Sequence, residues 1–526
     1  MWMLSHFQQD EFVRQGSWAL LFALFAHGVF LGVYRLFLSP LAKVPGPKLA
    51  AFTGYYESYY EVCLGGQYFK RVAEMHRQYG NQGPIVRVTP NEVHFSDPEA
   101  IDTIYPTTGR KTDKPQWFAD RTGTPYSIVS TPGHDMHRRR RNALNSFFSV
   151  ASIRRLEPIL HQNIEKMLRR LQRVGDSEDV VQVHRVFKAC ASDVITSYAL
   201  NDSFGFLDME DYGKAWFDST DVFFFLTHVF AVFPWFVQLV QFTPSWLVEA
   251  LVPSLRFLRL RQTWWLDRVR EIRSSPDPSK VKTTIFAGIL GSSLADDQKT
   301  DIRLASESQL VIFAGEGTTA YTLTCAIYHL LANPEVARQL KEELARAVPG
   351  AAGGTIPDLS QVESLPYLNA VIQEAIRLHP GVMARQVRIS PYDPIIYRNR
   401  NTGEVYTISP GTVTSMSPLI THMNHHYFEE PYKFDPQRWI DDPSINKWFI
   451  GFSRGSRNCV GMTLARREMA LIISAIFLKY QIYQGQKGPT IELVNTVRER
   501  DIDANADYII PVPAKGSRGL VVRFRN

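Results

Sequence analysis

The chain has 526 residues and a formal net charge of +6, from 58 Lys and Arg against 52 Asp and Glu. This length allows one large domain with a sizeable core or several ordinary ones, and the weak positive charge does not indicate nucleic-acid binding. The four cysteines, Cys63, Cys190, Cys325 and Cys459, lie far apart, which excludes a paired zinc motif and a disulfide framework. The composition therefore predicts a globular protein of a reducing compartment.

The N-terminal region is unlike the rest, because residues 18–38 form an apolar run of the length that crosses a bilayer. Only His27 and Arg35 interrupt the run, and Arg35 is close enough to its end to reach the lipid headgroups. A cleaved signal peptide is the alternative, but its apolar region is usually shorter. We expect a lumenal segment over residues 1–17, a single-pass anchor in membrane lipid over 18–38, and a proline-rich hinge over 39–48.

The basic residues around the anchor predict its orientation. Arg35, Lys43 and Lys48 lie at its end or follow it, and Arg14 precedes it. The positive-inside rule therefore places the domain over residues 49–526 in the cytoplasm. In that compartment the formal glycosylation sequon at Asn201 stays unmodified.

Residues 222–242 form a second apolar stretch of membrane-spanning length. Pro234, His228 and two glutamines make it a poor span. We expect a helix–loop–helix region that lines a substrate pocket and dips into the membrane interface. Ordinary core helices are the alternative.

Helical spacing predicts helices over residues 151–174, 304–331 and 367–378. Short β-branched and aromatic runs predict strands over residues 85–88, 92–95, 387–389, 394–397, 405–408 and 520–524. Helices outnumber strands, so the sequence predicts one mainly α domain with small β-sheets. That fold class alone identifies no family.

Cys459 lies in the decapeptide Phe452–Gly461, FSRGSRNCVG, directly before an amphipathic stretch. A helix N-terminus with nearby arginines favours a thiolate, which is a nucleophile or a metal ligand; most free cysteines, however, are small buried hydrophobic groups. The pattern F-x-x-G-x-R-x-C-x-G resembles the haem-binding loop of the cytochrome P-450 family. The resemblance implies that Cys459 is the axial ligand of the haem iron, and that Phe452, Arg457 and Gly461 contact the cofactor.

Glu374 and Arg377 are three residues apart, and on an ordinary helix they would form a surface ion pair worth about 0.2–0.5 kcal/mol. They are followed by FDPQRW at residues 434–439 and then by the cysteine loop. This order resembles the Glu-x-x-Arg motif and the meander arginine of the same family. The resemblance implies a buried structural network of Glu374, Arg377 and Arg438 behind the loop.

The basic run His137–Arg141 would usually be a solvated face, and it could be mistaken for a nucleic-acid patch. Helical spacing puts His137 and Arg141 on one face, which resembles the Trp/His-x-x-x-Arg pattern of the family. The resemblance implies that these two residues and Arg385 bind haem propionates. It also implies a basic docking patch for an acidic flavoprotein reductase, formed by Arg138, Arg139, Arg140, Arg454, Arg466 and Arg467.

Residues 314–319 read AGEGTT inside the predicted long helix, where each glycine costs about 0.8–1 kcal/mol against alanine. The segment resembles the oxygen-binding motif of the family, and the resemblance implies that Thr318 assists proton delivery to dioxygen. The acid of that motif is replaced by Gly317, and the nearest carboxylate, Glu316, lies about 100° away around the helix. Three roles for Glu316 are therefore open. It delivers protons through water, or an altered helix turns it toward the oxygen site, or it has no proton role.

These motifs follow one another in the order of the family and resemble its fungal microsomal (class II) monooxygenases. The resemblance implies haem b (heme b, iron protoporphyrin IX), dioxygen, and electrons from NADPH through an NADPH-cytochrome reductase, with cytochrome b5 as a further electron donor. It implies an endoplasmic reticulum enzyme that hydroxylates or epoxidises a small apolar substrate in fungal secondary metabolism, such as terpenoid, polyketide or alkaloid biosynthesis. A haem-thiolate isomerase that uses no dioxygen and a non-enzymatic haem-binding sensor are the alternatives.

Overall fold

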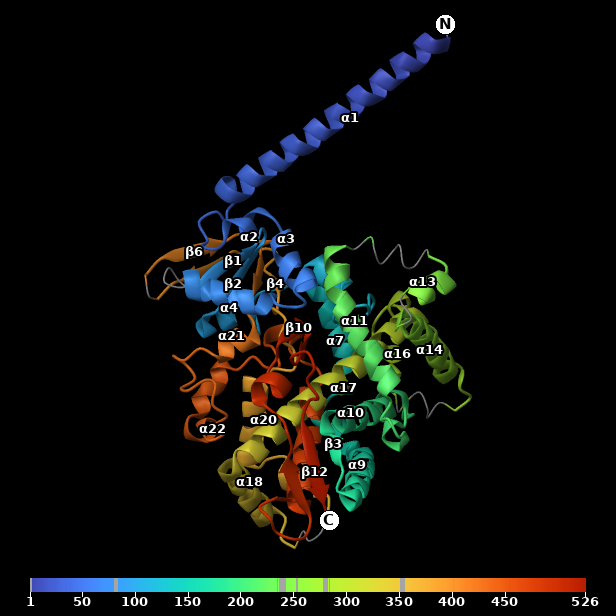
Figure 1. Cartoon of the computed structure of the whole chain (residues 1–526), viewed down its shortest axis with the longest axis vertical. Helices are drawn as coiled ribbons and strands as arrows, with labels where there is room; N and C mark the ends of the chain where they lie inside the picture. The colour runs from blue at the N-terminus through green and yellow to red at the C-terminus, as the bar shows by residue number, and fades with distance from the viewer. Residues whose placement is uncertain are drawn as a thin grey trace.

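The computed structural model describes residues 2–79, 84–233, 235, 243–251, 254–277, 282, 284–350, 355–400 and 402–526. Long helices surround a central helix, α17, with small sheets among and beside them (Figure 1). The N-terminal helix α1 projects away from this body. The predicted mainly α fold with small β-sheets is confirmed.

Helices make up most of the described chain. The longer ones are α1 (Trp2–Val33), α4 (Tyr68–Tyr79), α7 (His134–Asn145), α9 (Glu157–Ser177), α10 (Val183–Leu200), α11 (Lys214–Val232), α14 (Ser254–Ser274), α17 (Asp301–Ala332), α18 (Pro334–Ala347), α20 (Pro366–Leu378) and α23 (Met462–Lys479). The shorter ones are α2 (Lys48–Phe52), α3 (Tyr55–Ser58), α5 (Ile101–Ile104), α6 (Gln116–Asp120), α8 (Val150–Arg155), α13 (Ser245–Leu251), α16 (Ile285–Leu290), α19 (Leu359–Val362), α21 (Pro418–His422) and α22 (Arg438–Asp441).

The strands form small sheets that brace the helical body. One has the order β1-β2-β7-β4 and another β3-β12-β9-β8, and two hairpins pair β5 with β6 and β10 with β11. Their bounds are β1 (Ile85–Thr89), β2 (Glu92–Phe95), β3 (Val180–Gln182), β4 (Arg388–Ile389), β5 (Ile395–Arg398), β6 (Val405–Ile408), β7 (Val413–Ser415), β8 (Gln481–Ile482), β9 (Thr490–Leu493), β10 (Ala506–Tyr508), β11 (Ile510–Val512) and β12 (Val521–Arg525). The segment β12 closes the chain by pairing antiparallel with both β3 and β9.

The central helix α17 begins and ends where its sequence directs. The Thr300 side chain caps its N-terminus by accepting a hydrogen bond from the Arg303 amide, and Pro334 starts the next helix directly after it. Gly315 lets α10 approach closely, because a Cβ there would lie 3.1 Å from the Ile195 side chain. The long helix is therefore fixed against its neighbours near the unusual AGEGTT segment.

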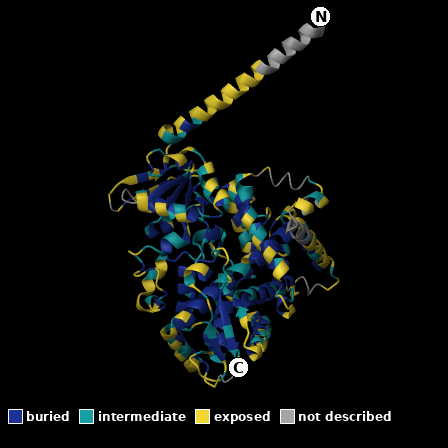
Figure 2. Cartoon of the chain, viewed as in Figure 1, coloured by how far each residue is buried: buried dark blue, intermediate teal, exposed yellow. Residues whose placement is uncertain are grey.

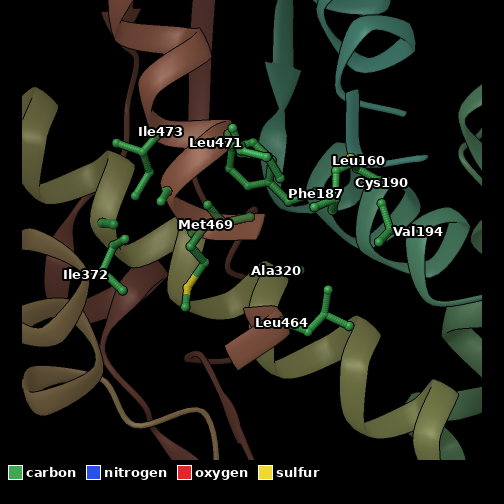
Figure 3. Packing of buried hydrophobic residues seen from close by; sticks show 14 of the residues in the cluster. Leu160, Phe187, Cys190, Val194, Ala320, Ile372, Leu464, Met469, Leu471 and Ile473 are labelled. Atoms are coloured by element: carbon green, nitrogen blue, oxygen red, sulfur yellow. The ribbon is translucent and has the colours of Figure 1, made fainter. Parts of the chain in front are cut away.

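A continuous apolar core joins α10, α17, α20 and α23. Figure 3 shows Phe187 and Cys190 of α10, Ala320 of α17 and Leu464 of α23 in this packing. Fully burying a leucine- or phenylalanine-sized side chain contributes about 1.5–3 kcal/mol, so this contact holds α17 against α23, the helix that follows the cysteine loop. Cys190 serves here as a small core residue.

Most predicted elements are present, and their differences have local causes. The predicted helix over 151–174 is divided at Leu156 into α8 and α9, because Pro158 lies in the first turn of α9 and suits a helix start. The predicted strand over 394–397 begins one residue later, after Pro394. Residues 222–232 of the second apolar stretch lie in α11, whereas Pro234 and 236–242 lie outside the described residues.

The apolar N-terminal segment is one long helix that runs into the π-helical turn Tyr34–Leu38. Residues Gln15–Leu38 are long and apolar enough to cross a membrane, and they are almost wholly exposed (Figure 2). Arg35 also reaches back to the domain, since it donates to the Phe52 carbonyl at 2.8 Å. A second stretch of sufficient length, Asp296–Ala332, is mostly buried and contains the core helix α17.

Candidate active site

The loop before α23 holds Cys459 in a closed turn. The Cys459 amide donates to the Phe452 carbonyl at 2.8 Å. Gly455 has a φ of +72°, and a Cβ there would meet the Tyr105 carbonyl oxygen at 2.8 Å. Only glycine tolerates both the positive φ and this close approach, so Gly455 allows the loop to pack against Tyr105.

The Cys459 side chain is exposed although the protein surrounds its loop. Burial raises the pKa of its thiol, while the backbone N–H groups of Gly461 and Met462 and the cation of Arg141 lower it. The amides and Arg141 thus act on the thiol in the direction expected from the sequence, while the protein packed around the sulfur acts against them. A metal ion bound to the sulfur would favour the thiolate further.

The predicted network of Glu374, Arg377 and Arg438 is present behind the loop. Glu374 and Arg377 are fully buried, and Arg377 donates to both carboxylate oxygens at 2.7 Å. Arg438 Nε donates to Glu374 Oε1 at 3.2 Å, and the Trp439 indole donates to Oε2 at 2.9 Å. Trp439 carries no sequence signal for this role beyond its position next to Arg438.

The network reaches the cysteine loop through a histidine. Burial lowers the pKa of His422 to about 3, so its imidazole is neutral. Its Nδ1 donates to the Arg377 carbonyl, and its Nε2 accepts a hydrogen bond from the Ile450 amide, each at 3.0 Å. The Ile450 carbonyl then accepts from the Ser453 amide at 2.9 Å. A movement of Arg377 would therefore be transmitted to the loop that holds Cys459.

A cluster of basic side chains lies on the other side of the loop, and its members are Lys114, His137, Arg141, Arg388 and Arg457. Burial, followed by the charges of Arg388 and Arg457, holds the pKa of Lys114 well below its ordinary value. Burial and the Arg457 charge also lower the pKa of His137 to about 2. Throughout the described ranges, no carboxylate oxygen lies within 4.0 Å of these five side chains.

The hydrogen bonds of the basic cluster go to neutral groups. Arg457 donates to the carbonyls of Thr112, Thr131 and Pro132, and burial and Arg388 lower its pKa to about 9. Arg141 donates to the Asn458 carbonyl at 2.5 Å and so contacts the residue before the cysteine. Arg388 and Arg457 are buried and Lys114 and Arg141 are half-buried. A group of basic side chains without a carboxylate fits a ligand that carries more than one negative charge.

Arg385, which the resemblance predicts to bind a propionate, lies outside this cluster and is paired with carboxylates. Arg385 Nε donates to Glu92 at 2.8 Å, and its Nη2 pairs with Glu57. Arg388 occupies the predicted place instead, since it donates to Ser453 Oγ in the cysteine loop at 3.1 Å. Residues three apart in an extended chain point to opposite faces, and the sequence alone did not tell which of the two arginines faces the loop.

Thr318 lies on an open face of α17. Its hydroxyl donates to the Ala314 carbonyl at 2.8 Å, and Ala314 is exposed in the middle of this mostly buried helix. Glu316 is 2% exposed and lies on another face, where its Oε2 accepts from Ser192 at 3.0 Å and from the Trp216 indole at 3.3 Å. The structure therefore separates Glu316 from Thr318, because the two point in different directions around one helix.

Open space borders both the central helix and the cysteine loop. A Cβ added at Gly317 or at Gly461 would meet no heavy atom within 4 Å. Cys459 of the loop and Ala314 of α17 are also exposed, so the protein leaves room beside each of them. The donor set fits haem: one thiol for iron, and basic side chains for its two propionates.

The arginines of the predicted docking patch differ in exposure. Arg138 and Arg139 are exposed, and Arg454 and Arg466 are half-buried. Arg140 instead turns inward and donates to Gln298 at 2.6 Å. Arg467 also leaves the patch, because it is buried and pairs with Glu363 at 2.5 Å.

Comparison with known proteins agrees with this site. A sequence model described as cytochrome P-450 matches residues 44–497. A cytochrome P-450 monooxygenase of Ascocoryne sarcoides is 36% identical over 94% of this chain and 96% of its own length. An N-acetyltryptophan 6-hydroxylase of Emericella nidulans is 34% identical over 97% of this chain and 98% of its own length. A tryptophan 6-hydroxylase of Fusarium equiseti is 35% identical, over 94% of each chain.

The lone cysteine, the buried network behind it and the open face of α17 define a haem-thiolate protein. The chain belongs to the cytochrome P-450 family. It is a monooxygenase of the fungal type, and this class is favoured over a rearrangement enzyme or a sensor because its relatives are named monooxygenases and hydroxylases.

Proposed function

We propose that Cys459 coordinates the iron of haem b in the space below α17, and that the enzyme hydroxylates or epoxidises a mainly apolar small molecule. The observation that carries this proposal is the exposed thiol of Cys459 next to a cluster of basic side chains that have no carboxylate partner among the described residues. When bound, the haem supplies the reductive activation of dioxygen. The protein supplies binding, orientation and protons.

Each part of the site has a proposed task. Lys114, Arg141, Arg388 and Arg457 bind the propionates, and His137 lies among them. The N–H groups of Gly461 and Met462 donate to the Cys459 sulfur and so tune its basicity. Thr318, whose Oγ1 is held by the Ala314 carbonyl, passes protons from water in the open space. Glu316 has no part in this route.

The electrons are proposed to come from NADPH through a cytochrome reductase, with cytochrome b5 as a further donor. Exposed Arg138 and Arg139, with half-buried Arg454 and Arg466, offer positive charge to an acidic flavoprotein. The apolar helix Gln15–Leu38 and the basic residues after it support a single pass through the endoplasmic reticulum membrane with the domain in the cytoplasm. A glycan on exposed Asn201 in cells would contradict this orientation.

The substrate is proposed to be small and largely apolar, as in fungal terpenoid, polyketide or alkaloid biosynthesis. Phe223 of α11 and Phe313 of α17 have ring centroids 6.2 Å apart, beside the exposed Ala314. A Cβ at Gly123 would collide with the Phe223 ring at 2.1 Å, so the loop after α6 packs onto this ring. These aromatic groups support an apolar substrate body above Thr318.

The test is expression in microsomes followed by a reduced carbonyl spectrum and turnover with NADPH and dioxygen. The wild type should show the haem-thiolate signature, and Cys459→Ser should lose it while Cys190→Ser keeps it. Thr318→Ala should form at least about tenfold less product per NADPH consumed, because a positioned proton donor contributes 10²–10⁴-fold. A normal haem-thiolate signature in Cys459→Ser would contradict the proposal.

A further inference from the structure

The loop after α6, residues 121–132, is joined to the central helix α17 by a buried carboxylate. Glu307 of α17 is wholly buried, and its Oε1 accepts a hydrogen bond from the Ile128 amide of the loop at 3.3 Å. Its Oε2 accepts from Nη2 of Arg303, one turn earlier on the same helix, at 3.0 Å. Glu307 therefore holds together a loop and a helix that are far apart in the sequence.

The ion pair between Glu307 and Arg303 brings little net stability, because both charges lose their hydration when they are buried. Arg303 is as buried as Glu307, and within the described ranges its Nε and Nη1 have no hydrogen-bond partner. Burial raises the pKa of Glu307, while the charge of Arg303 and the Ile128 amide lower it. Apolar side chains of similar volume often pack equally well in such a place, so a role in holding Ile128 explains the pair better than a gain in stability does.

Hydroxyl groups cross-link the loop internally. Thr124 Oγ1 and Ser127 Oγ lie 3.0 Å apart, and Ser127 Oγ donates to Ser130 Oγ at 3.3 Å. Ser130 Oγ is also hydrogen-bonded to Thr122 Oγ1. All four side chains are buried or half-buried. A displacement at Ile128 would therefore be transmitted through the loop to Thr122.

The two ends of the loop contact different parts of the site. Near its start, the Phe223 ring leaves no room for a Cβ at Gly123, so the loop packs directly on this aromatic group. Near its end, the Thr131 carbonyl accepts from Arg457 of the basic cluster at 2.8 Å. The bond from Glu307 to the loop lies between these two contacts in the sequence and joins the same loop to α17.

We infer that Glu307 is a positioning residue for the substrate, because it fixes the loop that supports Phe223 against α17. The Phe223 ring lies 6.2 Å from the ring of Phe313 on α17, and a loosened loop would leave this aromatic pair without its support. A preorganised loop favours binding of a substrate body, because less conformational entropy is lost when the complex forms. This inference rests on the proposed function and adds a residue that determines how well the body of a substrate fits.

Two double variants separate the hydrogen bond to Ile128 from the ion pair. Both carry Arg303→Met. One adds Glu307→Gln, which keeps an oxygen for the Ile128 amide, and the other adds Glu307→Met, which does not. Hydrogen exchange of residues 121–132 in the full-length holoenzyme, measured by mass spectrometry, should be about 2- to 10-fold faster with Glu307→Met, as expected for the loss of one hydrogen bond. Exchange with Glu307→Gln should match the wild type.

Spectral titration with imidazole and 4-phenylimidazole tests the effect on a bound molecule. Both probes bind the haem iron, but only 4-phenylimidazole carries an apolar body. Its affinity should fall about 2- to 10-fold with Glu307→Met, because binding must then order the loop, and the affinity for imidazole should stay unchanged. Glu307→Gln should keep both affinities. The control Glu165→Met/Arg169→Met removes an exposed pair of the same spacing on α9 and should also keep both.

The inference is overturned if Glu307→Met leaves loop exchange or the ratio of the two probe affinities unchanged, or if Glu307→Gln behaves like Glu307→Met. Where the variant with Glu307→Met fails to load haem, Glu307→Leu replaces it, since leucine also lacks an acceptor. The reduced carbonyl spectrum of the wild type is recorded first, and a missing haem-thiolate signature contradicts the proposed function alone. Hydrogen exchange then still tests whether Glu307 holds the loop.

Discussion

At the scale of single residues, Glu374 joins four partners in the buried network. Its two oxygens accept from Arg377, Arg438, Trp439 and the Asp435 amide. No water reaches the carboxylate, because it is fully buried. The position of the cysteine loop therefore depends on this one charge, through the path from Arg377 to His422 and Ile450.

We predict that Glu374→Gln abolishes haem incorporation. Removing one partner of a buried ion pair costs about 3–5 kcal/mol, because the other charge stays buried without compensation. The measurement is the ratio of haem to purified protein. Glu335→Gln is the matched control, since Glu335 is an exposed partner of Arg338 and its loss should leave the ratio unchanged. A haem-replete Glu374→Gln protein would show that the network is dispensable.

A second residue-scale prediction concerns Glu316, whose carboxylate faces α10 and α11. Glu316→Gln keeps an oxygen that accepts from Ser192 and Trp216 but removes the ionisable group. We expect turnover within about twofold of wild type, because general acid–base roles are worth 10²–10⁴-fold and none is lost. The measurement is product per NADPH over a range of pH, and a large fall would restore Glu316 to the proton route.

At the scale of elements, α17 combines two glycines that have opposite surroundings. Gly315 touches Ile195 of α10, whereas Gly317 faces open space. The first glycine serves helix packing, and the second leaves room on the open face of the helix. The cost of both in helix propensity is offset by tertiary contacts of this long, mostly buried helix.

We predict that the two glycine-to-alanine variants change stability in opposite directions. Gly317→Ala should stabilise by up to about 1 kcal/mol, because alanine favours a helix and its methyl group meets no atom. Gly315→Ala should destabilise by about 1–3 kcal/mol, because its methyl group presses on the Ile195 side chain in a packed interface. Thermal unfolding of the two proteins measures this, and equal shifts in melting temperature would contradict the assigned surroundings.

The helices and strands can be predicted from local sequence patterns. The parts of the site that lie in motifs can be predicted from the resemblance of these motifs to the family. The periodicity of residues 304–331 predicts α17, and Glu374, Arg377 and Arg438 meet as expected. What the sequence could not supply are directions in space. The choice between Arg385 and Arg388, for example, depends on which face of an extended segment meets the loop.

At the scale of the whole molecule, charge is arranged around the site rather than spread evenly. The basic cluster lies inside or partly inside the protein, and Arg138 and Arg139 of α7 are exposed. The same helix therefore contributes His137 and Arg141 to the site and two arginines to the surface. A partner that docks on these arginines would lie close to the edge of the cofactor and could deliver electrons over a short path.

We predict that Arg139→Glu lowers reductase-supported turnover several-fold at low salt, because a steered encounter of opposite charges is weakened. The effect should fade as ionic strength approaches 0.15 M, where the Debye length is about 8 Å. The measurement is NADPH-dependent product formation at several salt concentrations, with cumene hydroperoxide replacing the reductase in a parallel assay. Hydroperoxide-supported turnover should stay unchanged, since Arg139 is exposed and outside the site. Arg77→Glu makes the same charge change on α4 and should leave reductase-supported turnover unchanged. An equal loss of turnover in both variants would show that net charge, and not the position of Arg139, determines the rate.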